Sequence, residues 1–148
     1  MNITKETRIY VAGCGGMLGE AVYNHFNPIS EVLATDIDTN ESWLDYADVR
    51  DYSSISHSIE EFQPHIIINL AALTDLEECE ENKENAWLTN GLGAENIVLI
   101  ASKLNATLIH ISTAGIFYGK KEYYSDFEIP NPMGIYAKSK HYAEIIVS

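Results

Sequence analysis

A tyrosine and a lysine near the end of the sequence have the spacing of an acid–base pair. Tyr136 and Lys140 are four residues apart, so within a helix they lie on one face. An ammonium group and a helix N-terminus, which Pro132 helps to place, both favour the phenolate form of a nearby tyrosine. Such a tyrosine can act as an acid or a base near neutral pH. Ser112 and Thr113 end an apolar run upstream, and the Thr113 hydroxyl can share a substrate oxygen with the phenol.

A glycine-rich turn at residues 13–19 has the spacing of a nucleotide-binding loop. Gly13 allows a tight turn from strand to helix, Gly16 lets the backbone approach a pyrophosphate, and Gly19 lets the helix pack close to the sheet. The free amides at the start of the next helix attract an anion. Cys14, within the turn, is expected to be a small apolar filler and not a redox group.

An aspartate follows the second apolar run of the chain. Dinucleotide-binding folds place a carboxylate there that accepts hydrogen bonds from the adenosine ribose, and Asp36 has that position, with Asp38 two residues on. Because a carboxylate repels a 2′-phosphate, Asp36 favours NAD(H) over NADP(H). Arg50 does not obviously supply a phosphate clamp from its position in the sequence.

Alternating strands and helices are expected to position these residues. Short apolar runs rich in β-branched residues predict buried strands, and the stretches between them have helical spacing. The predicted strands are 9–12, 31–35, 65–70 and 107–111. The predicted helices are 17–26, 55–62, 86–104 and one from about 135 onward. Each interval has room for a crossover helix, so we expect an α/β fold with a Rossmann-like, doubly wound parallel sheet and helices on both faces. Residues 112–134 have no clear period and are expected to form a long functional loop.

Composition excludes several classes of function. The chain has 148 residues, 46% of them hydrophobic, which suits one globular domain. A net charge of −13 argues against binding to nucleic acid or to an anionic membrane surface. No apolar run approaches the roughly 20 residues of a membrane span, and the first residues do not resemble a signal peptide, so a cytoplasmic location is expected. Two distant cysteines predict neither a disulfide nor a metal site.

Taken in order, the motifs resemble those of the extended short-chain dehydrogenase/reductase family. The shared elements are Gly13-x-x-Gly16-x-x-Gly19, Asp48-Val49, Asn69-Leu70-Ala71-Ala72, Asn90, Ser112-Thr113 and Tyr136-x-x-x-Lys140. Within that family, segments 68–75 and 130–140 are most similar to the dTDP-4-dehydrorhamnose reductases. The similarity covers nearly the whole chain and implies that residues 1–148 form an NAD(P)-binding Rossmann domain.

The resemblance also implies roles for individual residues. The implied cofactor site consists of Gly13, Gly16, Met17, Leu18, Gly19, Asp36, Asp48, Val49, Leu70, Ala71, Ala72, Tyr136 and Lys140. In the chemistry of the family, hydride passes from the nicotinamide to the C4 ketone of a nucleotide-activated sugar. Tyr136 would then give the oxygen its proton, Lys140 would hold the nicotinamide ribose, and Thr113 would orient the carbonyl group.

One segment departs from the pattern of the reductases. Residues 112–115 read Ser-Thr-Ala-Gly where the reductases usually have Ser-Thr-Asp-Tyr, so a substrate-facing carboxylate is missing. The Thr-Asp-Glu of the sugar 4,6-dehydratases is also missing, whereas the small residues are compatible with the sugar 4-epimerases. A reductase is therefore the first hypothesis and an epimerase the second. A third is a non-catalytic dinucleotide-binding subunit, like the regulatory subunit of methionine adenosyltransferase.

Members of the family continue beyond the tyrosine helix with a smaller portion that binds the sugar nucleotide. The present sequence stops at Ser148, so we expect that portion to be absent and this fragment alone to be inactive. The last predicted strand would then have an open edge, which could pair with a second copy in a homodimer.

Overall fold

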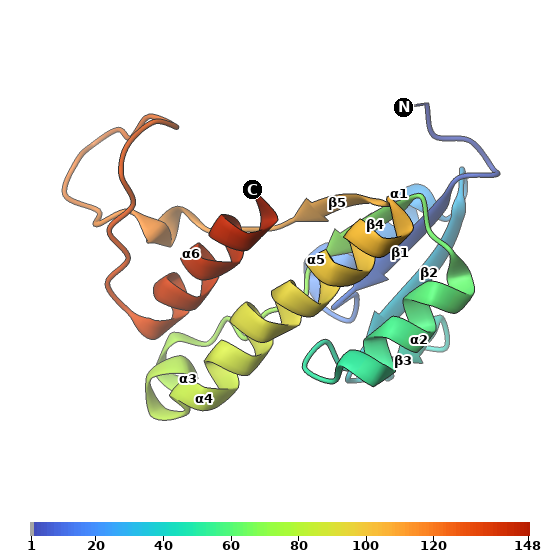
Figure 1. Ribbon diagram of the computed structural model, residues 1–148, viewed down its shortest axis with the longest axis horizontal. Coiled ribbons are helices and arrows are strands. Elements are labelled where there is room, and N and C mark those ends of the chain that lie inside the picture. The colour runs from blue at the N-terminus through green and yellow to red at the C-terminus, as the bar shows by residue number, and fades with distance from the viewer. Residues whose placement is uncertain (1) are drawn as a thin grey trace.

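Five parallel strands form the centre of the molecule. The computed structural model describes residues 2–148 and places the strands in the order β3-β2-β1-β4-β5 (Figure 1). The strands are β1 (Arg8–Ala12), β2 (Glu31–Asp36), β3 (Leu44–Tyr46), β4 (Ile66–Asn69) and β5 (Thr107–His110). All four pairings are parallel, so the carboxyl ends of the strands share one edge of the sheet. This arrangement confirms the predicted doubly wound fold.

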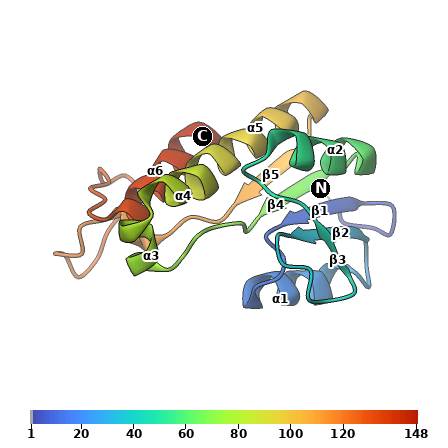
Figure 2. The same ribbon diagram turned by 90° about the horizontal axis from the view of Figure 1, so that it is seen from below.

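Helices cover both faces of the sheet. The helices are α1 (Met17–Phe26), α2 (Tyr52–Phe62), α3 (Leu76–Glu81), α4 (Lys83–Ala86), α5 (Gly93–Leu104) and α6 (Ile135–Val147). A π-helical turn, η1 (Trp87–Leu92), joins α4 to α5, and a 3₁₀ turn, η2 (Ala114–Ile116), follows β5. Figure 2 shows α1 on one face of the sheet and α2 with α5 on the other. None of the helices formed by residues 2–148 has the length and apolar character needed to cross a membrane.

Side chains alternate between two cores because successive residues of a strand point to opposite faces. Along β1, Ile9 and Val11 pack in the core beneath α1, whereas Tyr10 and Ala12 pack in the core beneath α2 and α5. Both faces of β1 and β4 are therefore buried, which explains their continuous apolar sequences.

Two parts of the predicted pattern were wrong in detail. Strand β3 was not predicted, because it has three residues and only Leu44 among them is buried. The predicted helix 86–104 is three segments, since α4 and the π turn precede α5. The long loop at 112–134 is confirmed, with η2 as its one regular turn among the described residues.

Candidate functional site

A cavity of about 520 Å³ opens at the carboxyl ends of the strands. Every residue assigned above to the cofactor lines it. In open α/β sheets this edge is where ligands bind, because the loops that leave neighbouring strands diverge there. The structure therefore brings residues that are more than 100 positions apart, such as Gly13 and Tyr136, into one site.

The glycine turn passes very close to neighbouring backbone at two positions. A Cβ on Gly13 would lie 2.3 Å from the nitrogen of Ala71, and Gly13 has a φ of +74°. A Cβ on Gly19 would lie 2.2 Å from the carbonyl oxygen of Cys14. Gly16 differs from both, because a Cβ there would meet no atom within 4 Å. Gly16 is also the N-cap of α1 and provides no side-chain cap, so the first amides of the helix face open space in the cavity.

The carboxylate of Asp36 sits directly against the glycine turn. One oxygen accepts a hydrogen bond from Gly15 N at 2.8 Å and the other accepts one from Asp38 N at 3.0 Å. Asp36 also lines the cavity, so its negative charge is available to a ligand there. Cys14 is fully buried, and burial together with Asp36 raises the pKa of its thiol to about 12. An inert thiol of this kind fits the predicted filler role.

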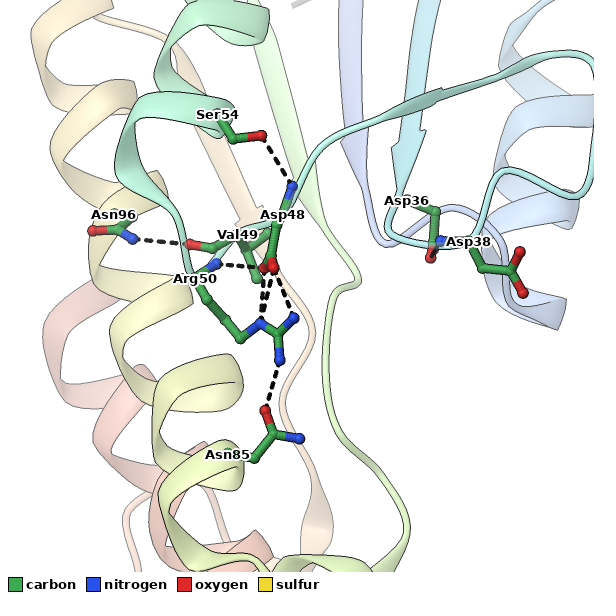
Figure 3. Close-up of polar contacts among 8 residues, drawn as sticks. All are labelled: Asp36, Asp38, Asp48, Val49, Arg50, Ser54, Asn85 and Asn96. Atoms are coloured by element: carbon green, nitrogen blue, oxygen red, sulfur yellow. Dashed lines mark hydrogen bonds and ion pairs between the residues drawn. The ribbon is translucent and has the colours of Figure 1, made fainter.

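On the opposite wall of the cavity, Arg50 forms a bidentate ion pair with Asp48 (Figure 3). Its Nη2 lies 2.7 Å from Asp48 Oδ2, and its Nη1 donates to Asn85 Oδ1 of α4 at 2.8 Å. Hydrogen bonds from Arg50 lower the pKa of the Asp48 carboxyl, although partial burial opposes this shift. No role was predicted for Arg50. The available signal was the Asp-x-Arg spacing, because residues 48–51 form a turn in which Asp48 Oδ1 accepts a hydrogen bond from Arg50 N at 2.9 Å.

The loop that contains Asp48 and Val49 is held by two further hydrogen bonds. Asp48 N donates to Ser54 Oγ at 3.3 Å, and Asn96 Nδ2 of α5 donates to Val49 O at 2.8 Å (Figure 3). Asn96 is buried, so the second bond is shielded from water. These two hydrogen bonds tie this wall of the cavity to α2 and α5.

Helix α6 contributes Tyr136 and Lys140 to the lining of the cavity. The carboxylate of Glu80 in α3 caps the helix by accepting a hydrogen bond from Ile135 N at 2.7 Å. Lys140 is only 3% exposed, and its ammonium donates to the carbonyl oxygen of Ile111. Burial lowers the pKa of Lys140 to about 8, and Glu144 opposes the shift.

The two hydroxyl residues after β5 lie in different surroundings. Ser112 lines the cavity, and its Oγ is buried without a hydrogen-bond partner among residues 2–148. Thr113 lies just beyond the lining, where its Oγ1 accepts a hydrogen bond from Gly115 N at 3.1 Å and caps η2. Because Oγ1 acts as the acceptor in this bond, the hydroxyl proton of Thr113 is free to be donated to a substrate oxygen. That role stays a prediction.

Asn90 links the loop that follows β4 to helix α6. Its carboxamide accepts from Leu73 N at 2.8 Å and donates to Leu73 O at 3.0 Å. The same nitrogen donates to Ser139 Oγ at 3.1 Å. Asn90 is 1% exposed and lies in the π turn, which is a feature that often marks functional sites. Within the described part of the chain, no cluster of three or more His, Cys, Asp or Glu side chains is placed to hold a metal ion.

The fold of this chain is shared with known proteins. The family described as "RmlD substrate binding domain" matches residues 7–148. The chain belongs to this family.

Members of the RmlD family and related proteins are similar over almost the whole chain. The spore coat polysaccharide biosynthesis protein SpsK of Bacillus subtilis is 34% identical over 95% of this chain and 48% of its own length. The methionine adenosyltransferase 2 subunit beta of Xenopus tropicalis is 32% identical over 90% of the chain and 40% of its own length. The crystal structure of a Bacillus anthracis dTDP-4-dehydrorhamnose reductase in complex with NADP has a TM-score of 0.86 and 31% identity, over 99% of this chain and 50% of that one. The chain thus spans about half the length of these relatives.

Proposed function

We propose that this RmlD-family chain is the dinucleotide-binding and proton-donating part of an NAD(P)H-dependent reductase that acts on a nucleotide-activated 4-keto sugar. One observation carries the proposal: Tyr136 and Lys140 line the same cavity as the glycine turn at 13–19. A cofactor held by the turn would thus have a proton donor beside it. Similarity to the dTDP-4-dehydrorhamnose reductase of B. anthracis supports the substrate class.

The residues present fit a dinucleotide. The space in front of Gly16 and the uncapped start of α1 suit a pyrophosphate, which needs close backbone approach and free amides. When bound, the nicotinamide supplies a hydride to the carbonyl carbon of the substrate. Tyr136 donates a proton to the carbonyl oxygen as negative charge develops there, and Ser112 and Thr113 are the hydroxyl groups available to orient that oxygen. Lys140 holds the ribose next to the nicotinamide.

We further propose that the site prefers NAD(H). Asp36 lines the cavity at the proposed ribose end and Asp38 follows two residues later, and negative charge there opposes a 2′-phosphate. The guanidinium of Arg50, which could attract that phosphate, is engaged by Asp48 and Asn85. The B. anthracis relative was crystallised with NADP, so this preference is a property to be measured for the present chain.

Turnover tests the reductase hypothesis. In the protein purified at its native length, dTDP-4-dehydrorhamnose should stimulate oxidation of NADH or NADPH. Tyr136→Phe should slow this oxidation by about 100-fold or more, since general acid catalysis typically contributes that much. The affinity for NADH should stay the same because the ring is retained. Equal rates for the two proteins would reject the proposal.

A second candidate function is a non-catalytic regulatory subunit. The methionine adenosyltransferase relatives support it, and so do Ala114 and Gly115, which provide no polar side chain to bind a sugar. In that case the protein would bind the dinucleotide, leave sugar nucleotides unchanged and copurify with a partner in a fixed ratio. An epimerase would instead interconvert sugar nucleotides without net consumption of NADH.

A further inference from the structure

The N-terminal end of helix α6 is held by a side chain from another helix. Ile135 N, at the first position of α6, donates a hydrogen bond to Glu80 Oε1 of α3 at 2.7 Å. Gly134, the N-cap residue of α6, has no side chain that could accept from the first amides of the helix. A Cβ on Gly134 would lie 3.1 Å from Glu80 Oε1, so the glycine leaves the space that the carboxylate occupies. Glu80 therefore takes the place of the missing cap.

The turn that Glu80 holds is the one that carries Tyr136. Tyr136 follows Ile135 directly and lies in the first turn of α6. Two further contacts hold the helix, at Ser139 and at Lys140, and both lie three or more residues beyond the tyrosine. The first turn of a helix has free amides and frays most readily, so a contact there determines how firmly Tyr136 is placed.

Helix α3 connects Glu80 to the wall of the cavity. Asp75 caps α3 by accepting a hydrogen bond from Glu78 N at 2.9 Å, and Glu78 lines the cavity. The fully buried Cys79 donates from its Sγ to Leu73 O at 3.5 Å, and Leu73 also lines the cavity. Glu80 follows Cys79 in the sequence, so its carboxylate is carried by a helix that is tied to the loop after β4.

We propose that Glu80 is a positioning residue that fixes Tyr136 relative to the loop after β4. Its carboxylate acts through the backbone amide of Ile135, and Glu80 is not among the residues that line the cavity. A general acid must lie within hydrogen-bond reach of the reacting oxygen, so a loose first turn lowers the rate of the chemical step and leaves cofactor affinity almost unchanged. The consequence for turnover rests on the proposed function, whereas the attachment of the helix does not.

Amide hydrogen exchange in the 148-residue protein measures this attachment without any enzymatic activity. The two reporters are the amide of Ile135 and that of Lys138, which donates to Gly134 O at 2.9 Å. In Glu80→Ala both amides should exchange about fivefold faster, the usual size for the loss of a helix cap. Glu80→Gln keeps an oxygen that can accept from Ile135 N, so its exchange rates should stay within about twofold of those of the unaltered chain.

Glu81→Ala is the matched control for these two variants. Glu81 is the next residue of α3 and is exposed, as Glu80 is, so none of the three substitutions empties the core. Thermal unfolding should confirm that all three variants are folded. Exchange in Glu80→Ala that is no faster than in Glu81→Ala would overturn the proposal.

Turnover by the protein at its native length tests the consequence for the proposed reaction. The kcat of Glu80→Ala should fall by about tenfold, because a small misplacement of a catalytic group has effects of this size. The Kd for NADH should be unchanged, and Glu80→Gln should keep the kcat of the unaltered protein. Equal kcat values for Glu80→Ala and Glu81→Ala, or a Glu80→Gln variant as slow as Glu80→Ala, would overturn the positioning role. If the unaltered protein shows no turnover, the reductase hypothesis fails and the exchange rates alone decide whether Glu80 positions the helix.

Discussion

Arg50 and Asp48 form a two-point ion pair across the wall of the cavity, and Arg50 extends the contact to Asn85 of α4. The pair fixes the loop that carries Asp48 and Val49, which the family resemblance assigns to the cofactor site. In this arrangement the guanidinium group of Arg50 binds Asp48 and Asn85 and is not free to bind a phosphate group. In the proposed cofactor site, the unpaired charge at the ribose end is then that of Asp36, which lines the cavity.

Arg50→Ala should weaken cofactor binding more than it weakens the fold. The loop at 48–50 would lose its tie to α4, so we expect the Kd for NADH to rise about tenfold, which equals 1.4 kcal/mol. The loss of folding free energy should be roughly 1 kcal/mol, because the pair is partly screened by solvent. NADH fluorescence titration and urea unfolding measure the two effects.

Lys103→Ala is the matched control for that substitution. Lys103 forms an exposed ion pair with Glu60 at 2.8 Å, and neither residue lines the cavity. Cofactor affinity should therefore be unchanged. If both alanine variants bound NADH as tightly as the unaltered chain, Arg50 would not organise the site.

The Asp48–Arg50 pair also predicts a pH dependence. The folded-state pKa of Asp48 is lowered, so its contribution to stability is present above the ordinary aspartate pKa of about 3.9 and is lost as pH falls through the folded value. The difference in unfolding free energy between the chain and its Arg50→Ala variant should accordingly shrink below about pH 4. A constant difference from pH 7 to pH 3 would contradict this.

Gly13 and Gly16 should respond to alanine in opposite ways. Gly13→Ala places a methyl group 2.3 Å from Ala71 N at a positive φ, so we expect a loss of at least about 2 kcal/mol in stability. Gly16→Ala meets no protein atom and should fold normally, but its methyl group would occupy the space assigned to the pyrophosphate. Unfolding and NADH titration of both variants separate the two roles, and normal NADH binding by Gly16→Ala would refute the assignment.

Because Lys140 is buried, the free energy of unfolding should increase as pH rises above about 8. Its folded-state pKa of about 8 is below its ordinary value, so between the two values the unfolded chain binds more protons than the folded one. Stability should therefore rise as pH increases through this window, by an amount on the order of 3 kcal/mol for a fully developed shift. Lys140→Met should remove this slope. Urea unfolding of both proteins at a series of pH values from 7 to 10 measures this slope. If the unaltered chain showed no slope, a buried Lys140 with a lowered pKa would be contradicted.

Asp36→Asn should shift the cofactor preference. The amide retains an acceptor for Gly15 N and removes the negative charge, so the ratio of NADPH to NADH affinity should rise by about tenfold or more. Competitive titration with the two cofactors measures that ratio. An unchanged ratio would mean that Asp36 does not set the preference.

Much of the fold follows from local sequence, whereas the contacts that define the site do not. The β-branched runs of β1 and β4 predict strands because both of their faces are buried. Strand β3 has one buried residue and therefore no comparable pattern. The contacts between Arg50 and Asn85 and between His110 and Lys140 join residues 30 or more positions apart. No local periodicity encodes such pairs, and only the parallel order of the strands brings them together.

Transfer of a labelled hydride tests the proposed reaction most directly. NADH that is deuterated at the transferable position of its nicotinamide C4 would be incubated with dTDP-4-dehydrorhamnose and the protein at its native length, and the sugar product analysed by NMR. We predict deuterium at C4 of the sugar, with about 100-fold less in the Tyr136→Phe variant. A product with no deuterium, or equal labelling by both proteins, would contradict the proposed role of this site.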